Sequence, residues 1–244
     1  MEYSLVDNII YEDDGIIVVN KISNLPTVPL KKDKDKITLL DIVGEYCSQV
    51  KNFSGYNFHE GGVLHRLDTP TSGLVLVAKN KESFDFLREK QKENLFVKQY
   101  FVKAIYKQTL IDGFKEYPYK DPKSENIVVI KSLFRHYGEG RTSVRPVMED
   151  YHKQIVNKTS NTFYETKVNF KKEDEGINYF ICTLTNGFRH QIRAHMAWSG
   201  YPLLGDTLYG AEKATEFGLN CFSISFINPA TKLLQTVSLK EEKL

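Results

Sequence analysis

Apolar runs alternate with turn signals along the first third of the chain. Residues 9–11 and 16–20 are rich in isoleucine and valine, and the Asp-Gly pair at 14–15 between them is a strong turn sequence. This pattern predicts two short strands joined by a tight turn. Thr38 fits the N-cap of a helix that would turn the apolar residues after it toward a core. The apolar run at 73–78 predicts a buried strand.

Two long segments follow with different periodicity. Residues 81–94 have helical spacing, and residues 96–106 alternate as a strand does. The stretch 111–161 is polar and poorly periodic, so we expect irregular structure with short hairpins that faces the substrate. The mixed-charge run at 30–36 predicts a solvated loop. Further strands are expected at 162–170, 178–185, 221–227 and 233–239, and a helix at 189–199 that Gly200 ends.

Composition narrows the class of protein. Among 244 residues, 41% are hydrophobic and 26% are charged, as in ordinary globular proteins, and the alternating elements suggest one α+β domain, with two lobes as an option. No apolar run reaches the ~18 residues of a membrane span, so no membrane partner is expected. The net charge of +2 does not by itself indicate a polyanion partner. Without coiled-coil heptads, a monomer is the default.

The compartment is suggested by two features. The first residues are acidic where a secretory signal would be basic. Cys47, Cys182 and Cys221 are odd in number and far apart, which argues against a disulfide framework and against a structural zinc site. We therefore expect a cytoplasmic protein with reduced thiols.

Residues 65–73, His-Arg-Leu-Asp-Thr-Pro-Thr-Ser-Gly, hold the densest set of reactive side chains. They place one carboxylate, Asp68, among two bases and three hydroxyls, between two apolar runs. Loops at strand ends are where a rigid scaffold displays reactive groups. A turn in which Asp68 bonds only its own backbone is the competing interpretation, because aspartate before Thr-Pro commonly does this.

A second constellation runs from Asn186 to His195. On a helix, Arg189 and Arg193 would share one face, and two arginines at a helix N-terminus oppose the macrodipole unless an anion answers them. This favours a functional role for the segment. For His195, a core position and a functional position remain equally open.

Three other chemistries lack their motifs. No paired histidines flank a glutamate as in a zinc hydrolase, and no metal site is expected. The glycines form neither a phosphate loop nor a dinucleotide fingerprint. No serine lies in a Gly-x-Ser-x-Gly elbow, which leaves an acyl-transfer hydrolase without support.

Four segments, in order along the chain, resemble the RluA family of RNA pseudouridine synthases. HRLDTPTSGLVLVAK at 65–79 resembles the family's HRLDxxTSGLL signature, and YEDDGIIVVNK at 11–21 resembles its opening strand pair. KQYFV at 98–102 resembles its Lys-x-Tyr segment, and 187–210 resembles its TGRxHQIRxHxxxxGxPxxGDxxYG stretch. Together they cover most of the chain from about residue 9 to 228.

The resemblance implies both a fold and a reaction. The fold would be α+β, with a central mixed, largely antiparallel sheet flanked by helices and loops, and with two lobes around a cleft. Residues 1–244 would form a single catalytic domain without a separate N-terminal RNA-binding module. The reaction would convert uridine to pseudouridine in ribosomal or transfer RNA, with no cofactor and no metal. The catalytic residues implied are Asp68 as nucleophile or base, Tyr100 stacked on the uracil, and Arg193, whose charge would favour the ionised form of that carboxylate.

The resemblance also implies a set of substrate contacts. Ile192 would pack beneath the base, and His65 and Arg66 would help to open the RNA around the flipped nucleotide. The remaining expected contacts are Arg189, His190 and Gln191. The chain departs from the family pattern at two places: Asn186-Gly187-Phe188 stands for Thr-Gly-Arg, and Lys21-Ile22-Ser23-Asn24 stands for Lys-Pro-x-Gly.

Two other classes of function remain open from the sequence. A noncatalytic RNA-binding or ribosome-assembly protein could keep this fold, although it would have no physical reason to keep Asp68, Tyr100 and Arg193 together. A glycoside hydrolase would need a second carboxylate opposite Asp68, and no nearby acid is an obvious candidate.

Overall fold

The computed structural model describes residues 4–30, 35–57, 59–108, 111–160 and 162–240. The chain forms two compact units, Met1–Lys98 together with Asn220–Leu244, and Gln99–Leu219. It passes from the first to the second unit within β4 (Val97–Ile105) and returns at the start of β9 (Leu219–Ile227). The first unit is therefore assembled from two separate stretches of sequence, and the second from one.

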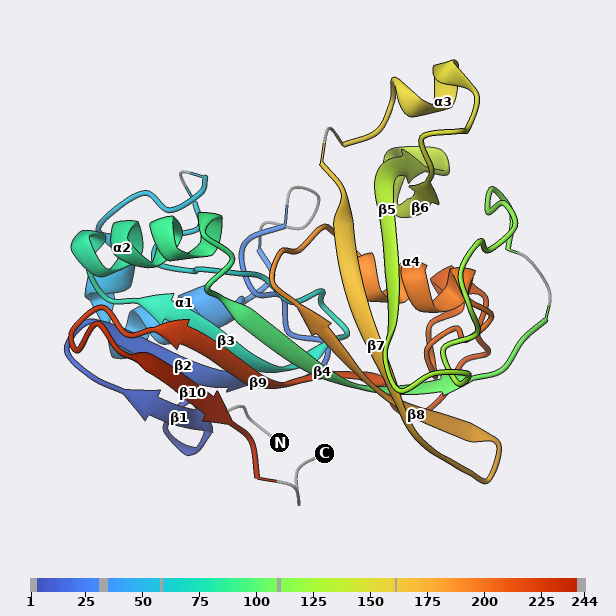
Figure 1. Ribbon diagram of the computed structural model, residues 1–244. Coiled ribbons are helices and arrows are strands. Elements are labelled where there is room, and N and C mark those ends of the chain that lie inside the picture. The colour runs from blue at the N-terminus through green and yellow to red at the C-terminus, as the bar shows by residue number, and fades with distance from the viewer. Residues whose placement is uncertain (1–3, 31–34, 58, 109–110, 161, 241–244) are drawn as a thin grey trace. The chain divides into compact units, whose positions relative to one another are not determined.

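The first unit is a sheet with helices on one side (Figure 1). Its strands are β1 (Ile9–Glu12), β2 (Ile16–Lys21), β3 (Ser72–Ala78), β9 and β10 (Leu234–Ser238), and its helices are η1 (Val6–Asn8), α1 (Leu39–Tyr46), η2 (Ser48–Lys51) and α2 (Lys81–Lys92). The order is β1-β2-β3-β9, with β10 beside β9. In the described part of this unit, β3 and β9 form the one parallel pair, through Ser72–Asn220 and Gly73–Cys221. The apolar sequences of β2 and β3 follow from their burial in the core.

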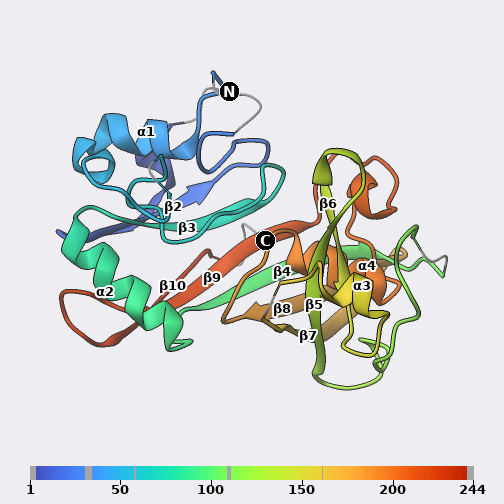
Figure 2. The same cartoon turned by 90° about the horizontal axis from the view of Figure 1, so that it is seen from above.

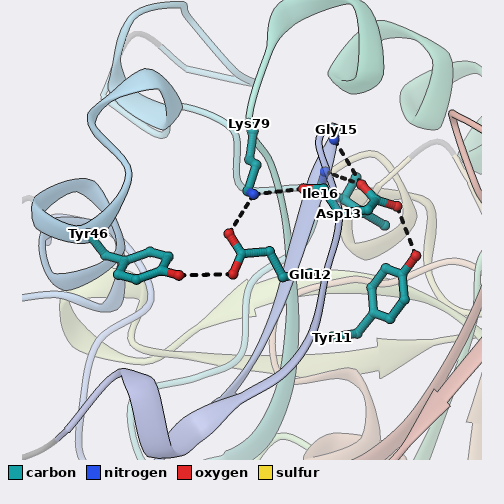
Figure 3. Close-up of polar contacts among 7 residues, drawn as sticks. All are labelled: Tyr11, Glu12, Asp13, Gly15, Ile16, Tyr46 and Lys79. Carbon is teal, nitrogen blue, oxygen red and sulfur yellow. Dashed lines mark hydrogen bonds and ion pairs between the residues drawn. The ribbon is translucent and has the colours of Figure 1, made fainter.

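A polar network secures the first hairpin (Figure 3). Lys79, directly after β3, forms an ion pair with Glu12 at 2.5 Å and donates to the Asp13 carbonyl at 2.7 Å. Tyr46 at the end of α1 donates to the same Glu12 carboxylate at 3.0 Å. The Asp13 carboxylate closes the turn by accepting hydrogen bonds from Tyr11 Oη, Gly15 N–H and Ile16 N–H. Local turn chemistry and one lysine thus tie the hairpin to a strand and a helix.

The second unit is an antiparallel sheet that packs against a buried helix, α4 (Gln191–Trp198). The strand order is β4-β8-β7-β5-β6, and β5–β6, β5–β7 and β7–β8 are antiparallel pairs. α4 packs against β6 and β7 (Figure 2). The other elements are β5 (Val128–Tyr137), η3 (Glu139–Arg141), β6 (Ser143–Val147), α3 (Lys153–Val156), β7 (Tyr164–Asp174), β8 (Ile177–Leu184) and η4 (Thr207–Tyr209).

Every residue of α4 is buried, so its polar side chains need partners inside the protein. Each ring nitrogen of His195 has a hydrogen-bond partner. Its Nε2 lies 2.9 Å from Ser132 Oγ on β5, and its Nδ1 lies 2.8 Å from Thr166 Oγ1 on β7. Burial lowers the pKa of His195 to about 3. Of the two positions left open by the sequence, the core position is confirmed.

Most sequence expectations for the fold are confirmed, and one boundary is wrong. The mixed, largely antiparallel sheet, the first hairpin and the Thr38 cap are present, and Thr38 Oγ1 accepts from the Asp41 N–H at 3.1 Å. The stretch 111–161 contains a hairpin, β5–β6, between irregular segments, as expected, although its first strand is ten residues long. The helix expected at 189–199 begins at Gln191, because His190 adopts a left-handed conformation with φ 56°. Of the run at 30–36, residues 31–34 lie outside the described part of the chain.

None of the described helices combines the length and the apolar character needed to cross a bilayer.

The buried histidine predicts how stability depends on pH. Because the folded-state pKa of His195 lies below its unfolded value of about 6.5, the unfolded chain binds the extra proton between pH 6.5 and 3. Stability should be fully present above pH ~6.5 and fall as the solution is acidified. For one such group the loss between pH ~6.5 and ~5 is about 2 kcal/mol. Urea unfolding across this range should show a flatter acid limb in His195→Gln than in the wild type.

The matched control is His152→Gln, which removes an exposed histidine. Its acid limb should follow the wild-type curve. Identical slopes in wild type and His195→Gln would contradict the assignment of His195 as a buried neutral residue.

Candidate functional site

The Asp68 segment is held by backbone contacts on both sides. Thr27, a buried residue, donates from Oγ1 to the Leu67 carbonyl at 2.8 Å and accepts from the Leu67 N–H at 3.2 Å. The Asp68 carbonyl accepts from the Thr71 N–H at 3.0 Å, which closes a turn. Gly73 then enters β3 with φ 111°, where a Cβ would lie 2.3 Å from the Cys221 carbonyl oxygen, so only glycine fits. Asp68 is therefore half-buried on a segment with little freedom.

A buried lysine lies beneath this segment in the same unit. Lys21, the last residue of β2, is fully buried, and its Nζ donates to the carbonyls of Ile22, Leu25 and Thr69 at 3.0, 2.7 and 3.2 Å. Burial lowers the pKa of Lys21 to about 7, and the attraction of Asp68 opposes this shift. Lys21 thus places a cationic group beside Asp68 and ties two loops together. The sequence signal was a lysine at the end of a strand whose first four residues are apolar.

One departure from the family pattern falls on these same loops. Asn24 adopts φ 65°, and Ser23 Oγ donates to the Pro70 carbonyl at 2.6 Å. The segment after Lys21 therefore still supports the Asp68 turn without the family's proline and glycine.

His65 and Arg66, which precede Asp68, differ in charge and in exposure. His65 Nε2 accepts from the Leu76 N–H at 3.2 Å, and burial, together with repulsion from Lys98, lowers the pKa of His65 to about 3. His65 is therefore neutral at pH 7. Arg66 has an exposed side chain, and its Nη1 pairs with the buried Glu60 carboxylate at 2.8 Å. Of the two, only Arg66 carries positive charge to the surface.

Arg193, on α4 in the second unit, forms a buried ion pair that the sequence analysis missed. Its Nε lies 2.7 Å from Asp206 Oδ2 and its Nη2 lies 2.8 Å from Asp206 Oδ1, a bidentate arrangement. The two side chains are 7% and 1% exposed. The rings of Tyr209 and Phe217 lie 5.1 and 5.3 Å from the guanidinium carbon. The available signal was Asp206 in the Gly-Asp-x-x-Tyr-Gly sequence, thirteen residues after Arg193.

The neighbours of Arg193 are also structural. Gln191 is buried, and its amide group donates to the Glu165 carbonyl at 2.9 Å and accepts from the Phe188 N–H at 2.9 Å. Ile192 is buried. His190 Nδ1 lies 3.1 Å from Tyr209 Oη. These residues fix the start of α4 and, through it, the position of Arg193.

Tyr100 and Lys98 lie on β4, and both point to a buried side of the strand. Burial lowers the pKa of Lys98 to about 8, and its Nζ lies 4.7 Å from the centre of the Phe96 ring. Lys98 and Arg193 are both buried, so neither offers positive charge to RNA at the outer surface.

Arg189 was expected to share one face of a helix with Arg193, and this is wrong. It precedes the helix, is exposed, and donates from Nη1 and Nη2 to the carbonyls of Arg141 and Thr142. Of the two arginines, only Arg193 therefore lies in the first turn of α4, where the helix dipole disfavours positive charge. The Asp206 carboxylate supplies the compensating negative charge.

Within the described ranges, no group of three or more histidine, cysteine or acidic side chains is arranged to hold a metal ion.

Comparison with known proteins fixes the family. The model of the RNA pseudouridylate synthase family matches residues 15–198, three quarters of the chain. The chain belongs to this family. The matched region contains Asp68, Tyr100 and Arg193, whereas Asp206 lies beyond its end.

Several curated members of the RNA pseudouridylate synthase family are similar to the chain. The ribosomal large subunit pseudouridine synthase D of Buchnera aphidicola (from Schizaphis graminum) is 31% identical over 217 residues, 88% of this chain and 57% of that protein. The dual-specificity RNA pseudouridine synthase RluA of Vibrio cholerae is 28% identical over 239 residues, 94% of this chain and 81% of that protein. An uncharacterised RNA pseudouridine synthase of Mycoplasma pneumoniae is 28% identical over 93% of this chain and 64% of its own length. The chain thus spans less than two thirds of several relatives.

Solved structures of the family agree on the fold. Human RNA pseudouridylate synthase domain containing 1 superposes with a TM-score of 0.68 at 20% identity, over all of this chain and 88% of that one. Human RNA pseudouridylate synthase domain containing 4 superposes with a TM-score of 0.65 at 15% identity, over 97% of this chain and 89% of that one. At these identities the likeness supports the fold alone.

The buried pair predicts a large loss of stability when Asp206 becomes neutral. Asp206→Asn removes the carboxylate but leaves the buried Arg193 guanidinium without its counter-charge. Breaking a buried pair in this way costs about 3–5 kcal/mol. Chemical denaturation of wild type and variant at pH 7 measures the loss.

Asp174→Asn is the matched control, because Asp174 pairs with Lys172 on the surface, where ion pairs contribute little. If both variants lost the same small amount of stability, the Arg193–Asp206 pair could not be a buried contact that holds α4 in place.

Proposed function

We propose that this chain isomerises uridine to pseudouridine in RNA without a cofactor. In this reaction the N1–C1′ bond breaks, the uracil turns, and a C5–C1′ bond forms. The proton lost from C5 is matched by one gained at N1, so no redox partner is needed. The observation that carries the proposal is the family membership of a chain in which Asp68 lies on a rigid segment and is attracted to a buried lysine, Lys21.

Asp68 takes the central role, as nucleophile toward the sugar or as the base that starts its opening. Catalytic carboxylates need a fixed position near the reacting atoms. The bonds from Thr27 to Leu67 and from Thr71 to Asp68 supply such a position.

The remaining roles follow the resemblance. Tyr100 stacks on the uracil and takes part in moving its proton, and Ile192 packs beneath the base. Arg193 stabilises the negative charge of the reacting carboxylate, and Asp206 keeps its guanidinium in one orientation. Arg66 and the neutral His65 help to hold the RNA open, while Arg189, His190 and Gln191 complete the substrate contacts, Gln191 by holding the start of α4.

The substrate is proposed to be ribosomal or transfer RNA. Relatives from Buchnera are named for the large ribosomal subunit, which makes large-subunit RNA the first class to test. We propose that the protein acts in the cytoplasm as a monomer, and the three free cysteines suit a reducing compartment. The competing proposal is a noncatalytic RNA-binding or assembly protein with this fold.

Mapping pseudouridines in total RNA from cells with and without the protein tests the proposal directly. We expect at least one site in ribosomal or transfer RNA to disappear with the protein and return when it is supplied again. An unchanged map would favour the noncatalytic alternative.

Asp68→Asn separates the catalytic role from a turn role. Asparagine forms the same local turn bonds, so a turn residue would tolerate the change. For a catalytic carboxylate, pseudouridine formation should fall by at least about 1000-fold, on the scale of losing an essential nucleophile or base. Single-turnover assays on the mapped RNA measure the rate, and melting temperature and RNA affinity report folding and binding.

Asp13→Asn is the matched control in the same unit. Asp13 is a true turn aspartate that accepts the Gly15 and Ile16 N–H groups, so its variant should keep the wild-type rate. A folded Asp68→Asn protein that kept a tenth of the wild-type rate of pseudouridine formation would contradict the catalytic assignment.

A further inference from the structure

One cluster of positive charge in the second unit extends beyond the single substrate contact proposed at Arg189. Arg141 and Arg189 are exposed. His136 on β5 is also exposed and lies near enough to both arginines that desolvation and their charges together lower its pKa. We call these three residues, together with Phe188, the hairpin patch. We propose that the hairpin patch binds an RNA strand, with its two arginines on phosphates and Phe188 against a base.

The arginines lack acidic partners. Among the described residues, no carboxylate lies within ion-pair distance of Arg141 or Arg189. The only acid in the connection between β5 and β6 is the exposed Glu139, whose backbone carbonyl accepts a bond from Thr142 Oγ1. Elsewhere in the same unit, exposed lysines such as Lys131 and Lys172 have carboxylate partners. The hairpin patch therefore keeps its charge for an external anion.

The backbone holds the two arginines close together. Arg189 Nη1 and Nη2 donate to the carbonyls of Arg141 and Thr142 at 3.1 and 2.9 Å. These bonds use two of the five guanidinium N–H donors, and a phosphate can accept from the others. Arg141 itself adopts φ 55°, a conformation that costs energy for a residue with a side chain. The connection thus accepts strain at the residue whose carbonyl holds the Arg189 guanidinium.

An aromatic surface adjoins these charges. The Phe188 ring is stacked on Phe134 at 5.1 Å with an interplanar angle of 5°, and Tyr164 lies 5.1 Å away. Phe188 and Tyr164 are half-exposed, and His136 lies 6.0 Å from Phe188. Positive charge beside stacked aromatic rings is the combination that binds single-stranded nucleic acid, because every base has a face that can stack. An acidic protein would have no need of the rings.

The location explains a departure in the sequence. Phe188 stands where the family pattern has arginine, and Arg189 carries the positive charge one residue later. Phe188 fills an aromatic stack, whereas Arg189 reaches the β5–β6 connection. The change therefore moves charge from the motif to the hairpin and adds a ring beside it. The inference rests on the proposed function only in taking RNA as the partner.

The test compares two variants that lose the same charge. Arg141→Gln/Arg189→Gln removes the two patch arginines, and Lys131→Gln/Lys172→Gln removes two lysines that already have carboxylate partners. The probe is a short fluorescein-labelled single-stranded RNA of mixed sequence, titrated by anisotropy at several salt concentrations. Two lost phosphate contacts should make the slope of log K against log salt shallower by about 1.4, or roughly 25-fold weaker binding at ~0.1 M salt. The lysine variant should keep the wild-type slope.

Phe188→Leu tests the aromatic part while keeping an apolar side chain on Phe134. It should weaken RNA binding by roughly fivefold or more without changing the salt slope, because stacking involves no counterion release. Circular dichroism and melting temperature confirm that each variant is folded.

Equal slopes in the arginine and lysine variants would overturn the inference. So would intact RNA binding together with lost binding of polyglutamate, which would indicate an acidic protein partner. Pseudouridine formation by the wild type is measured separately. If the wild type is active and the arginine variant keeps the wild-type salt slope, the hairpin patch is ruled out and the proposed function stands. If the arginine variant has a shallower slope but the wild type forms no pseudouridine, the hairpin patch stands and the proposed function is ruled out.

Discussion

The complete burial of α4 is the constraint on which the second unit depends. A helix without a solvent face has no water to satisfy its polar side chains, so each of them must find a partner in the sheet or in a neighbouring loop. His195 uses hydroxyls from β5 and β7, Gln191 uses the backbone of β7, and Arg193 uses Asp206. These bonds also fix the rotation and height of the helix. A side chain that projects from it, such as Arg193, therefore has a position set by several independent contacts.

The first unit solves a related problem with a lysine. The loops that carry Asp68 would otherwise leave several carbonyls of buried backbone without donors. Lys21 donates to three of them from the end of a core strand, and its charge is attracted to Asp68. One side chain thus links the shape of the segment to its electrostatics. Replacing it would disturb both at once.

Local signals in the sequence predicted the elements that depend on local chemistry. The Asp-Gly turn, the Thr38 cap and the alternation of β4 each involve residues close together in the chain. The position of β5 was missed because its flanks are polar and its long pairing with β7 joins residues far apart in the sequence. The start of α4 was misplaced because the left-handed conformation of His190 has no signature in residue type. Motifs indicated Asp68, Tyr100 and Arg193, but the partners Lys21 and Asp206 depend on contacts that only the fold creates.

The division of the chain between the units has a consequence for synthesis on the ribosome. The second unit is one continuous stretch, Gln99–Leu219, and can fold as soon as it has emerged. The first unit cannot: β9 and β10 are translated after the whole second unit, and until then the edge of β3 beside Gly73 has no strand to pair with. Such an edge is a template for the wrong partner. The nascent chain must therefore keep an incomplete sheet from associating with its neighbours while an entire second unit is made.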